Sequence, residues 1–179
     1  LVEASMAEPL ACCINSHNKV TIRVGDKVLI TGAGTIGLMQ LQIAKRRGAS
    51  TVVVVDIKQE QLDLAKKLGA DVALISGPEV AAELQQLAPR GFDVVIDATG
   101  VPPVVEMGIR LLANRGSFIA FGVCPTDSSI KVNPFDIFYR DLKIIGSYAL
   151  EKTMPQSIAM LSDGKMDLKP LIGEVITLD

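Results

Sequence analysis

The sequence predicts an α/β fold, with a doubly wound, six-stranded parallel sheet in a single domain. From Lys27 onward, short runs of β-branched residues alternate with amphipathic stretches, which is the pattern of parallel strands joined by crossover helices. Glycines follow three of the amphipathic stretches, at Gly48, Gly69 and Gly91, where a helix most easily ends. Hydrophobic residues make up 49% of the chain and Trp is absent, so the core is expected to be aliphatic, which suits a buried parallel sheet.

Six strands and five helices can be placed on this pattern. The expected strands are the β-branched runs at 27–31, 51–56, 72–75, 94–97, 117–121 and 142–147. Apolar residues recur at helical spacing at 38–44, 62–68 and 80–87, and further helices are expected at 104–112, after Pro102 and Pro103, and at 155–161. Six strands indicate two halves of three strands each.

The two ends of the chain differ from the middle. Residues 1–20 are mixed in character and lack strand periodicity, so they are interpreted as an irregular lead-in to a core at 21–165. Residues 166–179 form a return segment, in which another extended run begins at Leu168 and stops. No linker or repeat divides the chain, so one domain is expected over 1–179, cut from something longer.

Charge and cysteine content argue against several classes of protein. The chain has 18 basic and 20 acidic residues and no basic run, so nucleic acid is not an expected partner. The apolar runs at 52–55 and 94–96 are far shorter than the roughly 20 residues that span a bilayer, so no membrane is expected either. Cys12, Cys13 and Cys124 have neither disulfide nor metal spacing, which favours reduced thiols and a cytoplasmic location.

A glycine-rich turn is the strongest functional signal. Gly32, Gly34 and Gly37 form a G-x-G-x-x-G pattern between the first predicted strand and the first predicted helix. In a Rossmann fold the first glycine makes the tight turn, the second lets the backbone approach a pyrophosphate, and the third allows close packing of helix on strand. The helix N-terminus then attracts the phosphates. The pattern predicts a dinucleotide site, and the alternative is a glycine turn that only links strand to helix.

An acidic residue stands where such a site needs one. Asp56 ends the second predicted strand, about 20 residues after the glycines, where a carboxylate accepts hydrogen bonds from the adenosine ribose hydroxyls. This position predicts NAD rather than NADP, because a carboxylate repels a 2′-phosphate. The alternative is that Asp56 caps the helix that starts near Lys58.

The other charged residues nearby are given no firm role in binding. Lys58, Arg46 and Arg47 are the nearest cations to a 2′-phosphate, but nothing in their spacing aims them at it, and they are expected to be solvated. Asp97 ends the fourth predicted strand, and residues 97–100 are expected to turn the chain and line the adenine side. Its carboxylate is interpreted either as a hydrogen-bond acceptor within the loop or as a ligand contact.

Candidate catalytic groups are scarce. The only histidine, His17, lies in the lead-in and is expected to be a surface or packing residue. Cys12 and Cys13 have no partner cluster and are expected to be small buried residues. Without a base, a nucleophile or a ligand set, the sequence predicts no catalytic residue and no metal ligand.

Four segments, in order along the chain, resemble those of one family. They are E-P-L-A at 8–11, V-G-D-K-V at 24–28, K-L-G-A-D at 67–71 and F-D-V-V-I-D-A-T-G at 92–100. They are similar to segments of the zinc-dependent medium-chain dehydrogenases, the family of alcohol, sorbitol and threonine dehydrogenases, and the resemblance covers nearly the whole chain. It implies the coenzyme-binding domain of such an enzyme, whose zinc ligands belong to an N-terminal catalytic domain outside this sequence.

The resemblance also implies which residues contact the cofactor. Besides the glycines and Asp56, these are Thr35 and Ile36 over the pyrophosphate, Thr99 and Gly100 on the adenine side, Phe121, Gly122 and Val123 against the nicotinamide ribose, and Ser147, Tyr148 and Ala149 beside the nicotinamide.

Three positions qualify the resemblance. Gln61 stands where the family often has a basic residue. Ala149 and Leu150 replace the Arg-Tyr pair of sorbitol dehydrogenases, which puts a sorbitol-like substrate in doubt. Glu8 aligns with a glutamate near the catalytic zinc of polyol-type members, but it has no cluster to join and is interpreted as a surface acid.

The expected function is that of the NAD-binding domain of a zinc-dependent alcohol or polyol dehydrogenase, which positions nicotinamide for hydride transfer from a small alcohol or polyol. The alternatives are a dinucleotide-sensing module without an enzymatic role, and a zinc-free relative of quinone reductases. Zinc is expected only in the full-length enzyme, and the chain alone is expected to be inactive.

Two protein partners are expected. One is the missing catalytic domain, and the other is a second copy of the chain. Ile130 and Val132 alternate with Ser129 and Lys131, which predicts a short edge strand ending at Asn133. The family pairs this segment across a two-fold axis, so the resemblance implies a homodimer.

Overall fold

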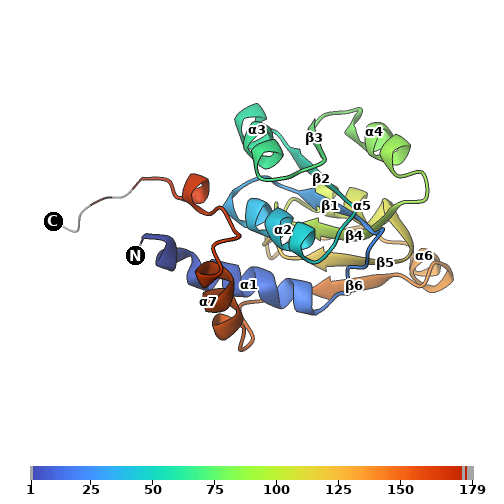
Figure 1. The fold of residues 1–179 in the computed structure, drawn as a ribbon. Helices are drawn as coiled ribbons and strands as arrows, with labels where there is room; N and C mark the ends of the chain where they lie inside the picture. The colour runs from blue at the N-terminus through green and yellow to red at the C-terminus, as the bar shows by residue number, and fades with distance from the viewer. Residues whose placement is uncertain (1, 175, 177–179) are drawn as a thin grey trace.

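A six-stranded sheet forms the centre of the molecule (Figure 1). The computed structural model describes residues 2–174 and 176. The strands are β1 Lys27–Thr31, β2 Thr51–Asp56, β3 Val72–Ile75, β4 Phe92–Asp97, β5 Leu112–Ala120 and β6 Lys143–Gly146. All neighbouring strands are parallel, in the order β3-β2-β1-β4-β5-β6. This order confirms the predicted doubly wound sheet, because the direction of winding reverses between β1 and β4.

Helices cover both faces of the sheet (Figure 1). They are α1 Ala7–Asn18, α2 Thr35–Arg46, α3 Gln59–Lys67, α4 Val80–Leu87, α5 Pro102–Arg110, α6 Pro134–Tyr139 and α7 Met154–Ser162, with the 3-10 helices η1 Val2–Met6 and η2 Lys169–Leu171. Successive side chains of a strand point to opposite faces, so β1 sends Val28 and Ile30 into the core shared with α1, α2 and α3. Its Leu29 enters the core shared with α4 and α5. In the part of the chain that the structure describes, no helix is long and apolar enough to cross a membrane.

The first three strands begin and end at the predicted residues, whereas the second half of the sheet differs. β4 begins at Phe92, two residues early, and β5 begins at Leu112 instead of residue 117. The register of β4 against β5 shifts after Phe92, and Arg115 within β5 has a φ of 65°. Such an irregularity breaks the alternation by which strands are recognised in a sequence. The early start of β5 also ends α5 at Arg110, two residues before the predicted end.

The predicted edge strand at 129–133 does not form in the single chain. Residues 129–133 are a loop, in which the Lys131 amide donates to the Glu106 carboxylate at 3.0 Å. The short helix α6 follows it and was not predicted; the Asn133 side chain caps it by accepting the Phe135 amide at 3.0 Å. An edge strand needs a partner strand, so pairing with a second copy stays a prediction.

The lead-in is helical, so the prediction of an irregular segment at 1–20 is wrong. η1 and α1 occupy almost all of it. The buried side of α1 includes the polar residues Asn15, Ser16 and His17, which interrupt the apolar stripe that marks a helix in a sequence. The extended run predicted from Leu168 begins instead as η2, and its last residues, 175 and 177–179, lie outside the described residues.

His17 is fully buried between α1 and α2. Its backbone oxygen accepts a hydrogen bond from Arg47 at 3.0 Å. Among the described residues, neither ring nitrogen has a hydrogen-bond partner. Burial, reinforced by the charge of Arg47, lowers the pKa of His17 from 6.5 to about 3. The sequence-based interpretation as a packing residue is therefore the correct one of the two, and the ring is neutral in the folded protein near pH 7.

This burial predicts a loss of stability in mild acid. The folded-state pKa of His17 lies below its unfolded value, so its contribution is complete above the unfolded pKa and is lost as pH falls. Between pH 7 and pH 5 the free energy of unfolding should drop by about 2 kcal/mol from this group. The His17→Leu variant should remove most of that slope in urea unfolding curves. A variant as pH-sensitive as the native chain would contradict the assignment.

Candidate functional site

The glycine-rich turn is fixed by close backbone packing. Gly32 leaves β1 with a φ of +95°, a conformation that side-chain-bearing residues rarely adopt, and its amide donates to the Val55 oxygen of β2 at 2.8 Å. A Cβ atom on Gly37 would overlap the carbonyl oxygen of Gly32. The third glycine therefore allows α2 to pack directly on the turn, as the sequence predicts.

The second glycine leaves open space above the turn. Gly34 is the N-cap of α2, and a Cβ atom there would meet no other atom within 4 Å. The first amides of a helix have no acceptor within the helix, and the N-cap glycine brings no side chain to satisfy them. The start of α2 thus presents amide donors, including those of Thr35 and Ile36, and no side chain at position 34 covers them.

Asp56 connects the turn to the end of β2. Its Oδ2 accepts the Ala33 amide at 2.6 Å, and its Oδ1 accepts the Lys58 amide at 2.9 Å. The alternative that Asp56 caps a helix is wrong, because α3 begins at Gln59 and its N-cap is Lys58, with no side-chain capping bond. The carboxylate is instead held beside the glycine turn by two backbone amides.

Asp97, at the end of β4, is fully buried and belongs to the loop itself. It accepts hydrogen bonds from the Thr31 hydroxyl at 2.9 Å, from the Thr99 hydroxyl at 2.6 Å and from the Gly100 amide at 3.0 Å. Of the two interpretations left open by the sequence, the geometry supports the loop acceptor. A Cβ on Gly122 would lie 2.7 Å from Asp97 Oδ2, so the loops after β4 and β5 pack closely around this carboxylate.

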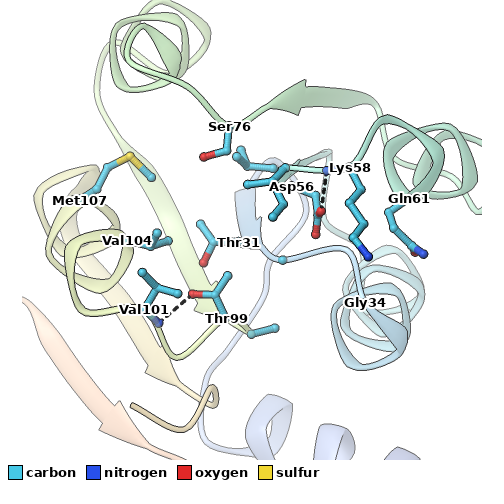
Figure 2. Close-up of a pocket in the computed structure, with 14 residues that line it drawn as sticks. Thr31, Gly34, Asp56, Lys58, Gln61, Ser76, Thr99, Val101, Val104 and Met107 are labelled. Atoms are coloured by element: carbon cyan, nitrogen blue, oxygen red, sulfur yellow. Dashed lines mark hydrogen bonds between the residues drawn. The ribbon is translucent and has the colours of Figure 1, made fainter. Parts of the chain in front are cut away.

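The glycine turn and Asp56 border a pocket of about 440 Å³ at the carboxyl ends of the strands. Of the predicted contacts, Gly32, Gly34, Asp56 and Thr99 line it. Figure 2 shows Asp56, Lys58 and Gln61 on one side of the pocket and Val101, Val104 and Met107 on the other. The pocket is therefore a slot with one polar and one apolar wall.

The apolar wall was missed by sequence reasoning. Val101, Val104 and Met107 lie at the start of α5 and along one side of it. The pattern identified a helix here but gave no reason to assign this side of it to a ligand. The available signal was the spacing of three residues between Val101, Val104 and Met107, which places these apolar side chains on the same side of a helix.

The remaining predicted contacts lie outside this pocket. Phe121, Gly122 and Val123 follow β5, and Ser147, Tyr148 and Ala149 follow β6, where the Ser147 amide donates to the Ala120 oxygen at 3.1 Å. Val123 is 91% and Tyr148 93% exposed. Both segments lie at the same edge of the sheet as the pocket but in the second half, and their contact with a cofactor stays a prediction.

The groups considered for catalysis do not form a cluster. Cys13 is buried as predicted, but Cys12 is half-buried and donates to the Glu8 carboxylate at 3.2 Å. Burial, and then the hydrogen bond to Glu8, raise the pKa of Cys12 to about 11, so it is a thiol near pH 7. Within the described residues, no three His, Cys, Asp or Glu side chains come close enough to hold a metal ion.

Of the cations expected to be solvated, Arg46 is exposed but has a partner on the protein, and Arg47 is half-buried. Arg46 forms an ion pair with Asp163, just after α7. Arg47 donates to the His17 oxygen and is half-buried, and this burial lowers its pKa. Lys58 is exposed and lines the pocket, so it is the nearest of the three cations to the site.

Comparison with known proteins identifies the family. The family described as zinc-binding dehydrogenase matches residues 35–163. The chain belongs to this family. It is 41% identical over 168 residues to D-altritol 5-dehydrogenase of Agrobacterium fabrum, covering 91% of this chain and 48% of that protein. It is 32% identical to the sorbitol dehydrogenase of Ovis aries, covering 99% of this chain and 51% of that enzyme.

Solved structures agree with the fold. A protein of Sinorhizobium meliloti described as a zinc-binding dehydrogenase, crystallised with NADP bound, superposes with a TM-score of 0.87 at 30% identity, over 92% of this chain and 49% of that one. The chain therefore spans about half the length of the relatives it matches.

Two glycines of the turn should respond differently to a methyl group. Gly37→Ala forces a Cβ against the Gly32 carbonyl, so α2 must shift, at a cost of roughly 1–3 kcal/mol or more. Gly34→Ala adds a methyl to open space at an allowed φ of −67°, so it loses only the preference of an N-cap for Gly over Ala and should lower the free energy of unfolding by no more than about 1 kcal/mol. Thermal unfolding of both variants checks this, and equal melting temperatures would contradict the packing described for Gly37.

Proposed function

We propose that this chain is the coenzyme-binding domain of a zinc-dependent alcohol or polyol dehydrogenase and that it holds NAD. The observation that carries the proposal is the turn at the β1–β4 switch point, where Gly34 leaves the N-terminus of α2 open beside the Asp56 carboxylate. In doubly wound sheets, dinucleotides bind at this switch point, with the pyrophosphate on the helix N-terminus.

The pocket fits the adenosine half of a dinucleotide. The backbone at Gly34, with the amides of Thr35 and Ile36, would hold the pyrophosphate, and Asp56 would accept the ribose hydroxyls. The apolar side chains Val101 and Met107 offer a flat base an uncharged wall. Asp56 is suited to this role because two backbone amides fix its orientation before any ligand arrives.

The nicotinamide half would lie across the second half of the sheet. The 121–123 and 147–149 segments, which follow β5 and β6, would border this half, as the family resemblance implies, whereas Thr99 and Gly100 would lie on the adenine side. Ser147 Oγ is buried and, among the described residues, has no hydrogen-bond partner, so a polar group of a ligand at this loop would satisfy it. When bound, nicotinamide supplies the hydride acceptor or donor, and the role of this chain is to bind and orient it.

The remaining parts of the proposal concern the whole protein. The substrate is a small alcohol or polyol, in line with the polyol dehydrogenases among the relatives. Zinc is held by a catalytic domain that adjoins this coenzyme-binding domain in the whole protein. Ala149 and Leu150 argue against a sorbitol-like substrate. We also propose that 129–133 pairs with a second copy and that the protein works in the cytoplasm.

The preference for NAD over NADP should depend on Asp56. Unit charges at ~4 Å interact by about 4 kcal/mol at an effective dielectric near 20, and even ~1.4 kcal/mol left after screening is a tenfold preference. Asp56→Asn keeps the shape of the side chain and removes the charge, and Asp56→Ser removes the carboxylate. Calorimetric titration should show the NAD to NADP ratio falling at least about tenfold in both variants.

A matched control is available on α3. Asp63 is an exposed carboxylate that accepts from Gln59 and does not line the pocket. Asp63→Asn should leave the ratio unchanged. Equal affinities for NAD and NADP in the native chain, or an unchanged ratio in Asp56→Asn, would remove Asp56 from this role.

The chain alone should oxidise no alcohol, even with NAD and zinc supplied. A catalytic zinc takes three protein ligands, and the described residues bring no such set together. Formation of NADH is followed by absorbance with altritol, sorbitol and ethanol as substrates, and bound zinc is measured by equilibrium dialysis. Sustained turnover in an uncontaminated preparation would show that the chain contains its own catalytic centre.

A further inference from the structure

A row of hydrogen bonds fastens α1 to the segment that follows β6. Positions 7, 11, 15 and 19 are spaced by one helical turn and so share one side of the helix. Ser157 donates to the Ala7 oxygen and Thr153 to the Ala11 oxygen, both at 2.7 Å; the Asn15 side chain donates to the Ala149 oxygen at 2.9 Å, and Lys19 to the Gly146 oxygen at 2.9 Å. Figure 1 shows α1 running beside α7, with β6 near its far end.

Asn15 is the member of this row that reaches the loop after β6. It is 3% exposed, and its Nδ2 lies 2.9 Å from the Ala149 oxygen and 3.5 Å from the Tyr148 oxygen. Hydrogen bonds of a buried amide to backbone are costly to lose, so this contact is a strong constraint on the loop.

The loop needs such a constraint. Ala149 and Lys152 are non-glycine residues with φ of 52° and 54°, a conformation that costs free energy and persists only where neighbours enforce it. Tyr148 is almost fully exposed and gains nothing from burial. The two carbonyls to which Asn15 donates are those of Tyr148 and Ala149, so these hydrogen bonds hold the backbone on both sides of the strained Ala149 Cα.

We propose that Asn15 is a positioning residue for the nicotinamide end of the cofactor site. The proposal rests on the proposed function, which assigns Ser147, Tyr148 and Ala149 to the nicotinamide. By fixing two carbonyls of this loop, Asn15 orients the backbone that faces the ring, although its own side chain is buried and contacts the loop from behind. The adenosine pocket, which lies across the sheet at the ends of β1, β2 and β4, does not involve Asn15.

The test separates the two halves of the cofactor. The native chain, Asn15→Ala and Asn15→Asp are titrated with NAD and with ADP-ribose, which lacks nicotinamide, and the emission of bound NADH is recorded. Asn15→Asp has the same size but presents a carboxylate to two carbonyls. Both variants should bind NAD about three- to tenfold more weakly and shift the NADH emission toward that of free NADH, with ADP-ribose affinity changed less than about twofold.

Asn18→Asp is the matched control. Asn18 also lies on α1 and also links it to α7, through Gln156 at 3.1 Å, but it does not reach the loop. It should leave both affinities and the NADH emission unchanged. Thermal unfolding of each variant verifies that it is folded.

The outcomes are distinguishable. A parallel loss of NAD and ADP-ribose affinity in Asn15→Ala would overturn the inference, because it would mean that Asn15 supports the whole domain. Equal affinities of the native chain for NAD and ADP-ribose, with NADH emission that does not respond to Asn15, would overturn it as well. A native chain that binds no ADP-ribose would contradict the proposed function itself.

Discussion

The approach of α2 to the end of β1 governs the first half of the site. Gly32 and Gly37 let two backbone segments lie closer than any side chain would permit, and this contact places the N-terminus of α2 at the carboxyl edge of the sheet. The Asp56 carboxylate then accepts a hydrogen bond from the amide of Ala33, which lies in the turn between β1 and α2. The phosphate donors and the ribose acceptor of the proposed site are thus positioned by one compact piece of backbone, with little contribution from flexible side chains.

Two carboxylates flank β1 in the sheet and have opposite roles. Asp56 ends β2 and borders the pocket, whereas Asp97 ends β4 and is buried among hydrogen bonds from Thr31, Thr99 and Gly100. Both stand at the end of a strand in the sequence, so position along the chain does not distinguish them. The difference comes from the neighbouring loops, since the backbone at Gly100 and Gly122 packs against Asp97 and leaves it fully buried.

The sequence was most informative where a single physical rule decides the structure. β1 and β2 match their predicted bounds because their apolar runs are buried on both faces, and the half-buried edge strand β3 matches its bounds as well. β5 begins earlier than predicted because Arg115 and a register shift interrupt the pattern, and α1 was missed because buried polar side chains break its apolar stripe. Of these side chains, Asn15 has its hydrogen-bond partner 134 positions away and Ser16 bonds to Gln40, 24 positions away, which no local pattern contains.

The candidate site shows the same division. The glycine turn and Asp56 could be predicted because their chemistry is local, contained in one strand, one turn and one helix. The apolar wall at Val101, Val104 and Met107 could not, because only the packing of α5 on the sheet decides which of its side chains meet the pocket. The loop after β6 likewise takes its shape from α1, and nothing in its own sequence indicates the strained conformation of Ala149.

The hydrogen bonds along α1 join residues that lie much farther apart in the sequence than those that form the glycine turn. The bonds from Asn15 and Ala7 to the β6–α7 segment join residues 134 and 150 positions apart, whereas the bond from Ala33 to Asp56 closes a loop of 23 positions. The entropy lost on closing a loop rises with its length, so the glycine turn and Asp56 can come together through local contacts, whereas the loop after β6 reaches its bonded arrangement only when α1 meets the region of α7. Circular permutation is tolerated where segments from the two ends of a chain lie close together. Here a linker between α1 and the region of α7 would not cross the edge of the sheet that carries the proposed site.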